Sequence, residues 1–119
     1  MAILISKFAT KADVESRLSF PTCSLGLLPF EEGQSMNMSL YDKCGCQWIF
    51  ACTIQQNDSI GQVLSMDWME FVRHKDVREN DKVIILEEEI IKNHIIGTRM
   101  KIEVKRKIRL FGQDIWADV

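Results

Sequence analysis

The sequence predicts one mostly β domain, a barrel or sandwich of about seven short strands with two short helices. Three observations support this prediction. The chain has 119 residues, a length that suits a single domain. Short runs of branched and aromatic residues recur along it and are separated by turn residues. Only two short segments show helical features, too few to cover both faces of a parallel sheet.

The first part of the chain combines a strand, a helix and a loop. Leu4–Phe8 has the composition of a short strand. A helix is expected over Lys11–Leu18, with Thr10 as its N-cap and Asp13 at the third helical position, where it can complete a capping box. Thr22–Gln34 contains glycine and proline, and we expect an irregular crossing loop that lies against the body through its apolar residues.

The middle of the chain predicts a hairpin followed by a strand and a second helix. Met36–Tyr41 and Gln47–Ile54 are strand-like segments on either side of turn residues, and the polar Gln55–Ser59 reads as a loop. Gly61–Ser65 is expected to be a short strand. A helix is expected over Met66–Arg73, with Ser65 as its cap and with Trp68, Phe71 and Val72 on one face.

The last part of the chain is dominated by strand signals. Lys82–Leu86 reads as a buried strand and Arg99–Phe111 as a long one, separated by a solvated acidic patch at Glu87–Glu89. Ile90–Gly97 fits either a strand or a helix.

Charge is distributed unevenly along the chain. The formal net charge is −2, from 15 basic and 17 acidic residues, whereas most DNA-binding domains are basic. The segment Lys92–Arg109, however, contains seven basic residues and one acidic residue, a local charge of +6, so the rest of the chain sums to −8. This dipolar layout could steer a phosphate backbone towards the domain despite the negative total.

Several classes of function lack support in the sequence. No apolar run is long enough to span a membrane, and the first residues do not resemble a signal peptide, so we expect an intracellular protein. The four cysteines lack the paired spacing of a zinc site; we expect free thiols, with Cys52 in the core, and no metal or cofactor. Neither histidine has an obvious partner and no nucleophile motif occurs, so an enzyme with a small-molecule substrate is not expected.

Six segments, taken in order, resemble the plant B3 DNA-binding domain family. They are Lys7–Val14, Arg17–Pro21, Asp42–Phe50, Val63–Val72, Val77–Val83 and Arg109–Gly112. The family patterns that they resemble are K-x-L-T-x-S-D-V, R-L-x-I-P, D-x-x-G-x-x-W-x-F, V-L-T-x-G-W-x-x-F-V, L-x-x-G-D-x-V and R-L-F-G. The length and the residue pattern of the chain are also similar to those of the B3-like domain of legume flowering-time repressors.

The resemblance implies a single B3-like DNA-binding domain over residues 1–119, a seven-stranded open pseudo-barrel with two short α-helices. Two arms of such a domain clamp the major groove of double-stranded DNA; here they would be Thr10–Ser19 and Gln55–Gln62. The implied function is sequence-specific DNA recognition for a plant transcriptional regulator in the nucleus. The narrower resemblance adds repression of flowering.

Some residues depart from the family pattern. Asp67 replaces a glycine, and Asn80 replaces a glycine at a position where asparagine also tolerates a left-handed backbone. Thr22 replaces a basic residue. Asp13 and Glu15 place acid in a segment that usually meets phosphates. These departures bear on the affinity for DNA rather than on the fold.

Candidate DNA contacts lie in the two arms and in the last strand. The first arm offers Lys11 and Arg17, supported by Ser16 and Ser19 through phosphate bonds. In the second arm, amide side chains can bond the N6/N7 edge of adenine, and serine can contact bases or phosphates; its candidates are Gln55, Gln56, Asn57, Ser59 and Gln62. Alternation in Arg99–Phe111 puts Lys105 and Lys107 on one face, as DNA contacts, as a solvated exterior, or as a charged edge that blocks aggregation. The arm residues could equally be ordinary surface residues.

Two functions therefore remain open at this point. The first is sequence-specific binding of duplex DNA. The second is a protein-interaction domain that keeps the B3-like fold, binds DNA weakly and recruits a co-repressor or another protein; the acidic residues and the net charge favour it. A platform for single-stranded nucleic acid would need exposed aromatic side chains, whereas the tryptophan and phenylalanine residues of the middle segments are expected in the core.

Overall fold

A computed structural model describes residues 2–21, 35–57, 59 and 61–119. The elements, in chain order, are β1 Ala2–Phe8, α1 Lys11–Glu15, β2 Leu18–Pro21, β3 Ser35–Tyr41, β4 Gln47–Asn57, β5 Gly61–Asp67, α2 Met69–Lys75, β6 Lys82–Lys92, β7 Ile95–Leu110 and β8 Gln113–Asp118. The crossing loop predicted over Thr22–Gln34 lies outside the described residues.

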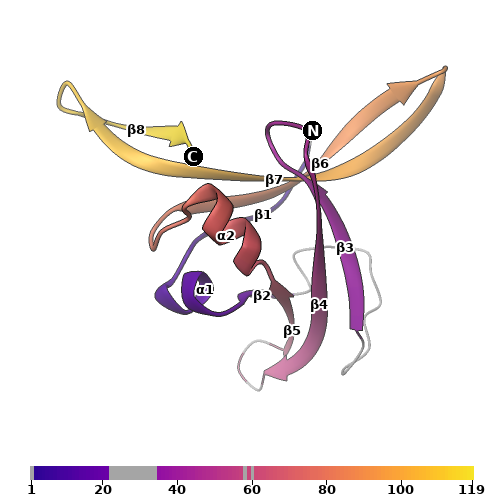
Figure 1. Ribbon diagram of the computed structural model, residues 1–119, viewed down its shortest axis with the longest axis horizontal. Coiled ribbons are helices and arrows are strands. Elements are labelled where there is room, and N and C mark those ends of the chain that lie inside the picture. Colours follow the sequence, from indigo (N-terminus) through magenta and orange to yellow (C-terminus); the bar gives the residue numbers. More distant parts are fainter. Residues whose placement is uncertain (1, 22–34, 58, 60) are drawn as a thin grey trace.

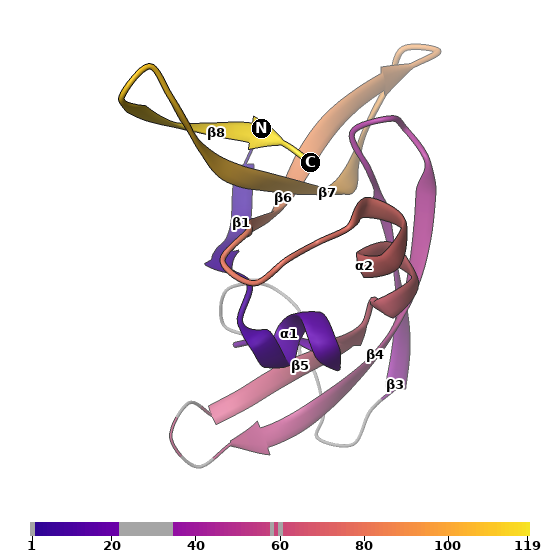
Figure 2. The ribbon, with the colours of Figure 1, turned by 60° about the vertical axis from the view of Figure 1, so that its left-hand side comes forward.

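The strands form one open sheet, curled around the core (Figures 1 and 2). Its main path has the order β1-β6-β7-β3-β4-β5-β2, and β8 pairs with β7 outside that path. Every pairing is antiparallel except β3 with β7, which are parallel and share one register pair, Tyr41 with Lys101. The predicted open pseudo-barrel with two short helices is thus confirmed, with the unpredicted β8 added to its seven-strand path.

The core fills the inside of the curled sheet and is closed by the apolar face of α2. Trp68, Phe71 and Val72 are buried together, as their helical spacing predicted. Alternate residues of the strands complete this core, including Leu40, Ile54, Leu64, Val83, Ile85 and Ile102. Stacked and edge-to-face contacts join Trp48, Phe50 and Phe71, so the aromatic residues of the middle segments are packed against one another.

Several predicted boundaries are wrong: β6 continues past the predicted Leu86 to Lys92 and β7 begins at Ile95, before the predicted Arg99, and three further differences lie at the helices and the second arm. The first helix ends at Glu15 because the chain turns into β2, where Leu18 and Phe20 are buried against β5. The second helix begins at Met69, and Ser65 is buried inside β5 instead of capping it. The predicted loop from Gln55 begins later, because β4 continues to Asn57 and pairs with β5 up to Gly61. In each case pairing in the sheet overrides local propensity.

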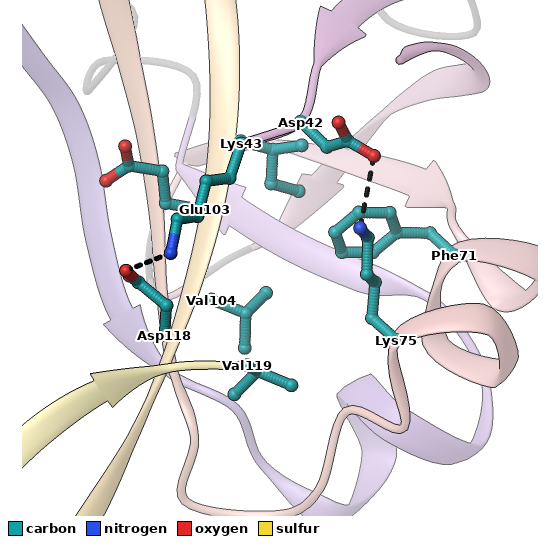
Figure 3. Close-up of a pocket in the computed structure, with 9 residues that line it drawn as sticks. Asp42, Lys43, Phe71, Lys75, Glu103, Val104, Asp118 and Val119 are labelled. Carbon is teal, nitrogen blue, oxygen red and sulfur yellow. Dashed lines mark hydrogen bonds and ion pairs between the residues drawn. The ribbon is translucent and has the colours of Figure 1, made fainter. Parts of the chain in front are cut away.

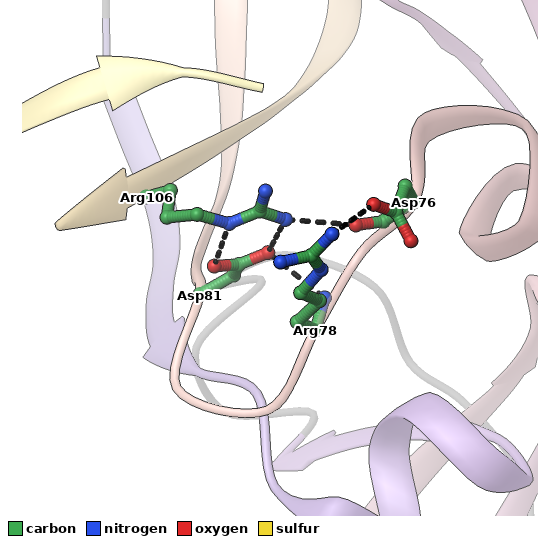
Figure 4. Close-up of polar contacts among 4 residues, drawn as sticks. All are labelled: Asp76, Arg78, Asp81 and Arg106. Atoms are coloured by element: carbon green, nitrogen blue, oxygen red, sulfur yellow. Dashed lines mark hydrogen bonds and ion pairs between the residues drawn. The ribbon is translucent and has the colours of Figure 1, made fainter. Parts of the chain in front are cut away.

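Buried carboxylates tie the turns to the sheet. Arg106 on β7 donates two hydrogen bonds to Asp81, from Nε to Oδ1 at 3.0 Å and from Nη2 to Oδ2 at 2.8 Å, and a third to the carbonyl of Asp76 (Figure 4). Asp42, in the β3–β4 turn, accepts bonds from Trp48 Nε1 and the backbone of Cys46 and pairs with Lys75 (Figure 3). Burial acts to raise the pKa of Asp42, but these partners outweigh it and hold the pKa below its ordinary value.

Two ribbons of paired strands extend beyond the core. The outer half of β6 with the start of β7 forms one, and the end of β7 with β8 forms the other (Figures 1 and 2). Both turn through left-handed residues, Asn93 and His94 in the first and Phe111 and Gly112 in the second. Exposed large apolar side chains are concentrated on them: Ile90, Ile91, Ile95, Ile96, Ile108, Leu110, Phe111, Ile115 and Trp116.

The cysteines of the described part are free thiols. Cys44 and Cys46 are exposed in the β3–β4 turn, and Cys52 is buried in the core, as predicted. Burial raises the pKa of the Cys52 thiol to about 11, so this group stays protonated at neutral pH. No group of three or more metal-ligating side chains occurs in the described part, and none of its helices is long and apolar enough to cross a membrane.

Candidate nucleic-acid interface

A groove of about 490 Å³ lies between the two predicted arms. Its lining includes Arg17 and Ser19 from the first arm and Gln55 from the second. It also includes Lys7 and Thr10, which were not predicted as site residues. Gln55 therefore meets two predicted contacts of the first arm, which precede it by more than thirty positions in the sequence, at one concave surface.

The first arm is held in place by a capped helix and a buried ion pair. Thr10 and Asp13 form the predicted capping box: Asp13 N donates to Thr10 Oγ1 at 3.2 Å, and Thr10 N donates to Asp13 Oδ2 at 2.9 Å. Lys7 Nζ pairs with the same carboxylate at 2.9 Å and donates to the carbonyl of Ser19 at 2.8 Å. Lys7 therefore joins β1, α1 and β2 across the open edge of the barrel.

Asp13 plays a different role from the one that its charge suggested. Its side chain is buried and satisfied by Lys7 and by the backbone of Thr10, and its own carbonyl accepts a bond of 2.8 Å from Trp68 Nε1. Because Lys7 neutralises the Asp13 carboxylate inside the arm, this carboxylate would not repel a DNA phosphate. Of the two acids noted in this segment, only Glu15 is exposed.

Arg17 connects the first arm to the strands of the second. Its Nε donates to Ser65 Oγ at 2.7 Å, and its Nη2 donates to the carbonyls of Ser65 and Ala51 at 3.1 and 3.4 Å. Nη1 has no partner among the described residues, so a ligand in the groove could still accept bonds from it. Arg17 is therefore a residue that sets the spacing of the arms as well as a candidate contact.

The remaining first-arm candidates lie around this groove. Lys11 is exposed, and its ammonium group has no partner within the described part of the chain. Ser16 is exposed at the end of α1, where its backbone N–H bonds the carbonyl of Ala12. Ser19 is half-buried in β2. Of the two serines, Ser19 lines the groove, whereas Ser16 lies outside its lining.

The second arm is a hairpin rather than a long loop. Gln55 pairs with Val63, Gln56 with Gln62 and Asn57 with Gly61. Gly61 is the first residue of β5 and has a positive φ. Gln55 is exposed and lines the groove beside Val63. Ser59 is exposed between the strands. For Gln56 and Asn57 the structure places the backbone in β4 and describes nothing further.

The basic stripe of β7 is not part of this groove. The ribbon carrying β7 and β8 lies at the opposite end of the molecule from the β4–β5 turn (Figures 1 and 2). Acidic residues also pair with much of the stripe: Glu88 with Arg99 and Lys101, Asp81 with Arg106, and Asp114 with Lys107. Lys105 is half-buried and lies between β6 and β8. These three acids therefore offset about half of the local charge of +6 in three dimensions.

Sequence reasoning missed Lys7 and Val63 as lining residues. A signal for Lys7 existed, because it opens the first segment that resembles the family, but its chemistry there depends on Asp13 and Ser19 in the folded chain. Val63 opens another segment that resembles the family, but its residue type indicates only a strand. Neither residue type indicates a nucleic-acid interface by itself.

Comparisons with known proteins support the fold. No protein-family model and no curated protein matches the sequence. The Arabidopsis FUS3–DNA complex is similar in structure, with 18% sequence identity and a TM-score of 0.59 over 84% of this chain and 95% of that chain. The Arabidopsis thaliana transcription factor LEC2, also solved as a DNA complex, has 22% identity and a TM-score of 0.60 over 72% of this chain and 82% of its own. Both are plant B3-domain proteins, so this chain has the fold that the sequence resemblance predicted.

Proposed function

We propose that this domain binds double-stranded DNA in a sequence-specific manner and serves a plant transcriptional regulator in the nucleus. The observation that carries the proposal is the groove in which Arg17 and Ser19 from one arm meet Gln55 from the other. The two similar structures were both solved with DNA, which supports the same ligand here. The resemblance to legume flowering-time repressors extends the proposal to repression of flowering.

The residues of the two arms suit different parts of the DNA. Lys11, whose ammonium group has no partner among the described residues, suits a phosphate, and Ser16 can add a neutral phosphate bond at the end of α1. Gln55 suits the N6/N7 edge of adenine, which an exposed amide can bond bidentately. The Nε and Nη2 groups of Arg17 already donate to Ser65, so its Nη1 group would donate to a base or a phosphate.

Fluorescence anisotropy with labelled duplexes of about 20 base pairs would test this proposal. A pool with randomised centres would be titrated at two salt concentrations, and the bound fraction would be sequenced. Micromolar or tighter binding that weakens with salt and enriches one motif is the expected result. A folded sample that fails to bind at low salt would overturn the proposal.

Matched variants would locate the interface. Lys11→Ala should weaken binding about equally for all sequences, whereas Lys92→Ala, an exposed lysine on the remote ribbon, should leave it unchanged. Gln55→Ala should relax the preference at one base pair and cost about 1–3 kcal/mol for the best site. Gln47→Ala, on the same strand but outside the groove, is its control.

A second candidate function is protein interaction with weak DNA binding. The observation that favours it is the exposed apolar side chains on the two ribbons, because a monomeric domain rarely leaves so many large apolar groups in water. A co-repressor is the partner that the narrower resemblance suggests. Retention of the domain by such a partner, together with absent duplex binding in the titration above, would favour this candidate over the first.

A further inference from the structure

Strands β3 and β7 run side by side at only one point. Their single register pair joins Tyr41 to Lys101, and both strands diverge on the N-terminal side of that pair (Figure 1). The edge of β7 that faces away from β6 is covered by β8 only from Lys105 onwards. Among the described residues, the backbone of 95–100 therefore has a strand partner on one side only.

A groove of about 550 Å³ lies in the angle between these strands. Apolar groups from three strands line it: Tyr41 from β3, Ile90 from β6 and Met100 from β7. Ser39 and Thr98 add hydroxyl groups. Ile95, exposed by 71%, continues the apolar surface along the face that carries Tyr41 and Ile90, whereas Ile96, exposed by 66%, lies on the opposite face of the ribbon. An unpaired strand edge thus borders a surface with pockets for side chains, the combination that accepts an added strand.

The charges around the groove indicate the chemistry of the added strand. Arg99 is already occupied, because it pairs with Glu88 at 3.2 Å and stacks over the ring of Tyr41 at 4.8 Å. Lys101 also contacts Glu88. Glu87, which lines the groove, and Glu89, two positions further along β6, have no ion-pair partner among the described residues. The exposed Lys92, opposite Ile95, lies on the other face of the ribbon. On the face that carries Glu87 and Glu89, the charges left uncompensated are therefore negative.

We propose that residues 95–100 of β7 bind an extended segment of a partner protein by strand addition, and that this segment alternates apolar with basic residues. Its backbone would pair with the free edge of β7. On one face of the sheet its apolar side chains would cover the surface formed by Tyr41, Ile90 and Ile95, and on the other face its basic side chains would meet Glu87 and Glu89. The site is remote from the arms, so the proposal does not depend on DNA binding.

The test uses a labelled peptide of about eight residues, alternating lysine and isoleucine, with blocked ends. Saturable binding to the full chain, measured by fluorescence anisotropy, is expected. A peptide of the same charge and length in which proline replaces each isoleucine cannot supply the hydrogen bonds of a strand and should not bind. Equal binding of the two peptides would mean charge attraction alone and would overturn the proposal.

Protein variants and hydrogen exchange complete the test. The double variant Glu87→Lys/Glu89→Lys should weaken peptide binding at least tenfold, while Glu79→Lys, an exposed acid in a distant turn, should not. Amides of 95–100 should gain protection when the peptide binds. Protection of other amides instead of these would contradict the proposal. So would protection of these amides in the absence of peptide that increases with protein concentration, because it would indicate a dimer. DNA titration of the same variants should be unaffected, which separates this inference from the proposed function.

Discussion

Single residues in this domain have partners that their place in the sequence does not reveal. Asp13 and Asp42 are acids, yet both are buried and are satisfied by backbone groups and by lysines that their positions in the sequence do not indicate. Asn80 takes a left-handed backbone with φ of 74°, as its place in the family pattern predicted. Burial of a carboxylate is tolerated only where such partners are in place.

Loss of Arg106 should destabilise the domain more than loss of other basic residues on β7. Arg106→Ala leaves the buried Asp81 without its bidentate partner, and we expect the free energy of unfolding to fall by about 2–4 kcal/mol. Lys107→Ala removes a solvent-exposed pair with Asp114 and should cost at most about 0.5 kcal/mol. Urea unfolding of both variants measures the difference, and equal losses would show that Asp81 finds other partners.

Asp42 should contribute to the acid sensitivity of the fold. Because its pKa in the folded protein lies below its ordinary value of 3.8, its stabilising effect is complete above that value and is lost as the pH falls through the lower, folded-state pKa. Asp42→Asn should therefore be less stable than the wild type at pH 6, by about 1–3 kcal/mol. The difference in the free energy of unfolding between the two proteins should become smaller below pH 4 in urea titrations. A difference that stays constant would show that the Asp42 carboxylate is not the cause of the acid sensitivity.

At the scale of elements, pairing and turns decide more than propensity does. The first arm depends on a short capped helix, and the second on a hairpin that extends two strands beyond the core. The β7–β8 ribbon ends in a two-residue turn whose first residue, Phe111, has φ of 52° and is 96% exposed. A phenylalanine in a left-handed conformation is strained, and here it gains no packing in return.

Replacement of Phe111 by asparagine should stabilise the domain. Asparagine favours the left-handed conformation that this turn requires, so Phe111→Asn is expected to raise the free energy of unfolding by about 0.5–1 kcal/mol. Phe111→Ala removes the same exposed ring without favouring the turn and is the control. Chemical denaturation distinguishes the two, and a loss of stability in both would mean that the ring packs against something in solution.

At the scale of the whole molecule, ion pairs change the meaning of the net charge. The basic segment of β7 faces acids from β6, β8 and the turn before β6, and these acids offset about half of its charge. The arms contribute Lys11 and Arg17, with Lys7 already paired to Asp13. DNA binding by the arms would therefore involve few charges.

The salt dependence of DNA binding should accordingly be shallow. Two or three phosphates neutralised by the arms predict a slope of log K against log salt of about −2 to −3. A contribution from the β7 stripe would make the slope about −5 or steeper. Anisotropy titrations between low and moderate salt measure it, with Lys105→Ala/Lys107→Ala as the control that should leave the slope unchanged.

The sequence alone determined the class of the fold, most of its strands, the capping box of α1 and the buried face of α2. These features depend on spacing along the chain, through alternation and helical periodicity, and a linear reading captures them. It also named Arg17, Ser19 and Gln55 through a family resemblance. Only the tertiary structure decided that these three share a groove, that Asp13 is neutralised by Lys7, and that the β7 stripe is partly compensated and remote from the groove. Those outcomes depend on which distant segments pack together, a property that no local pattern encodes.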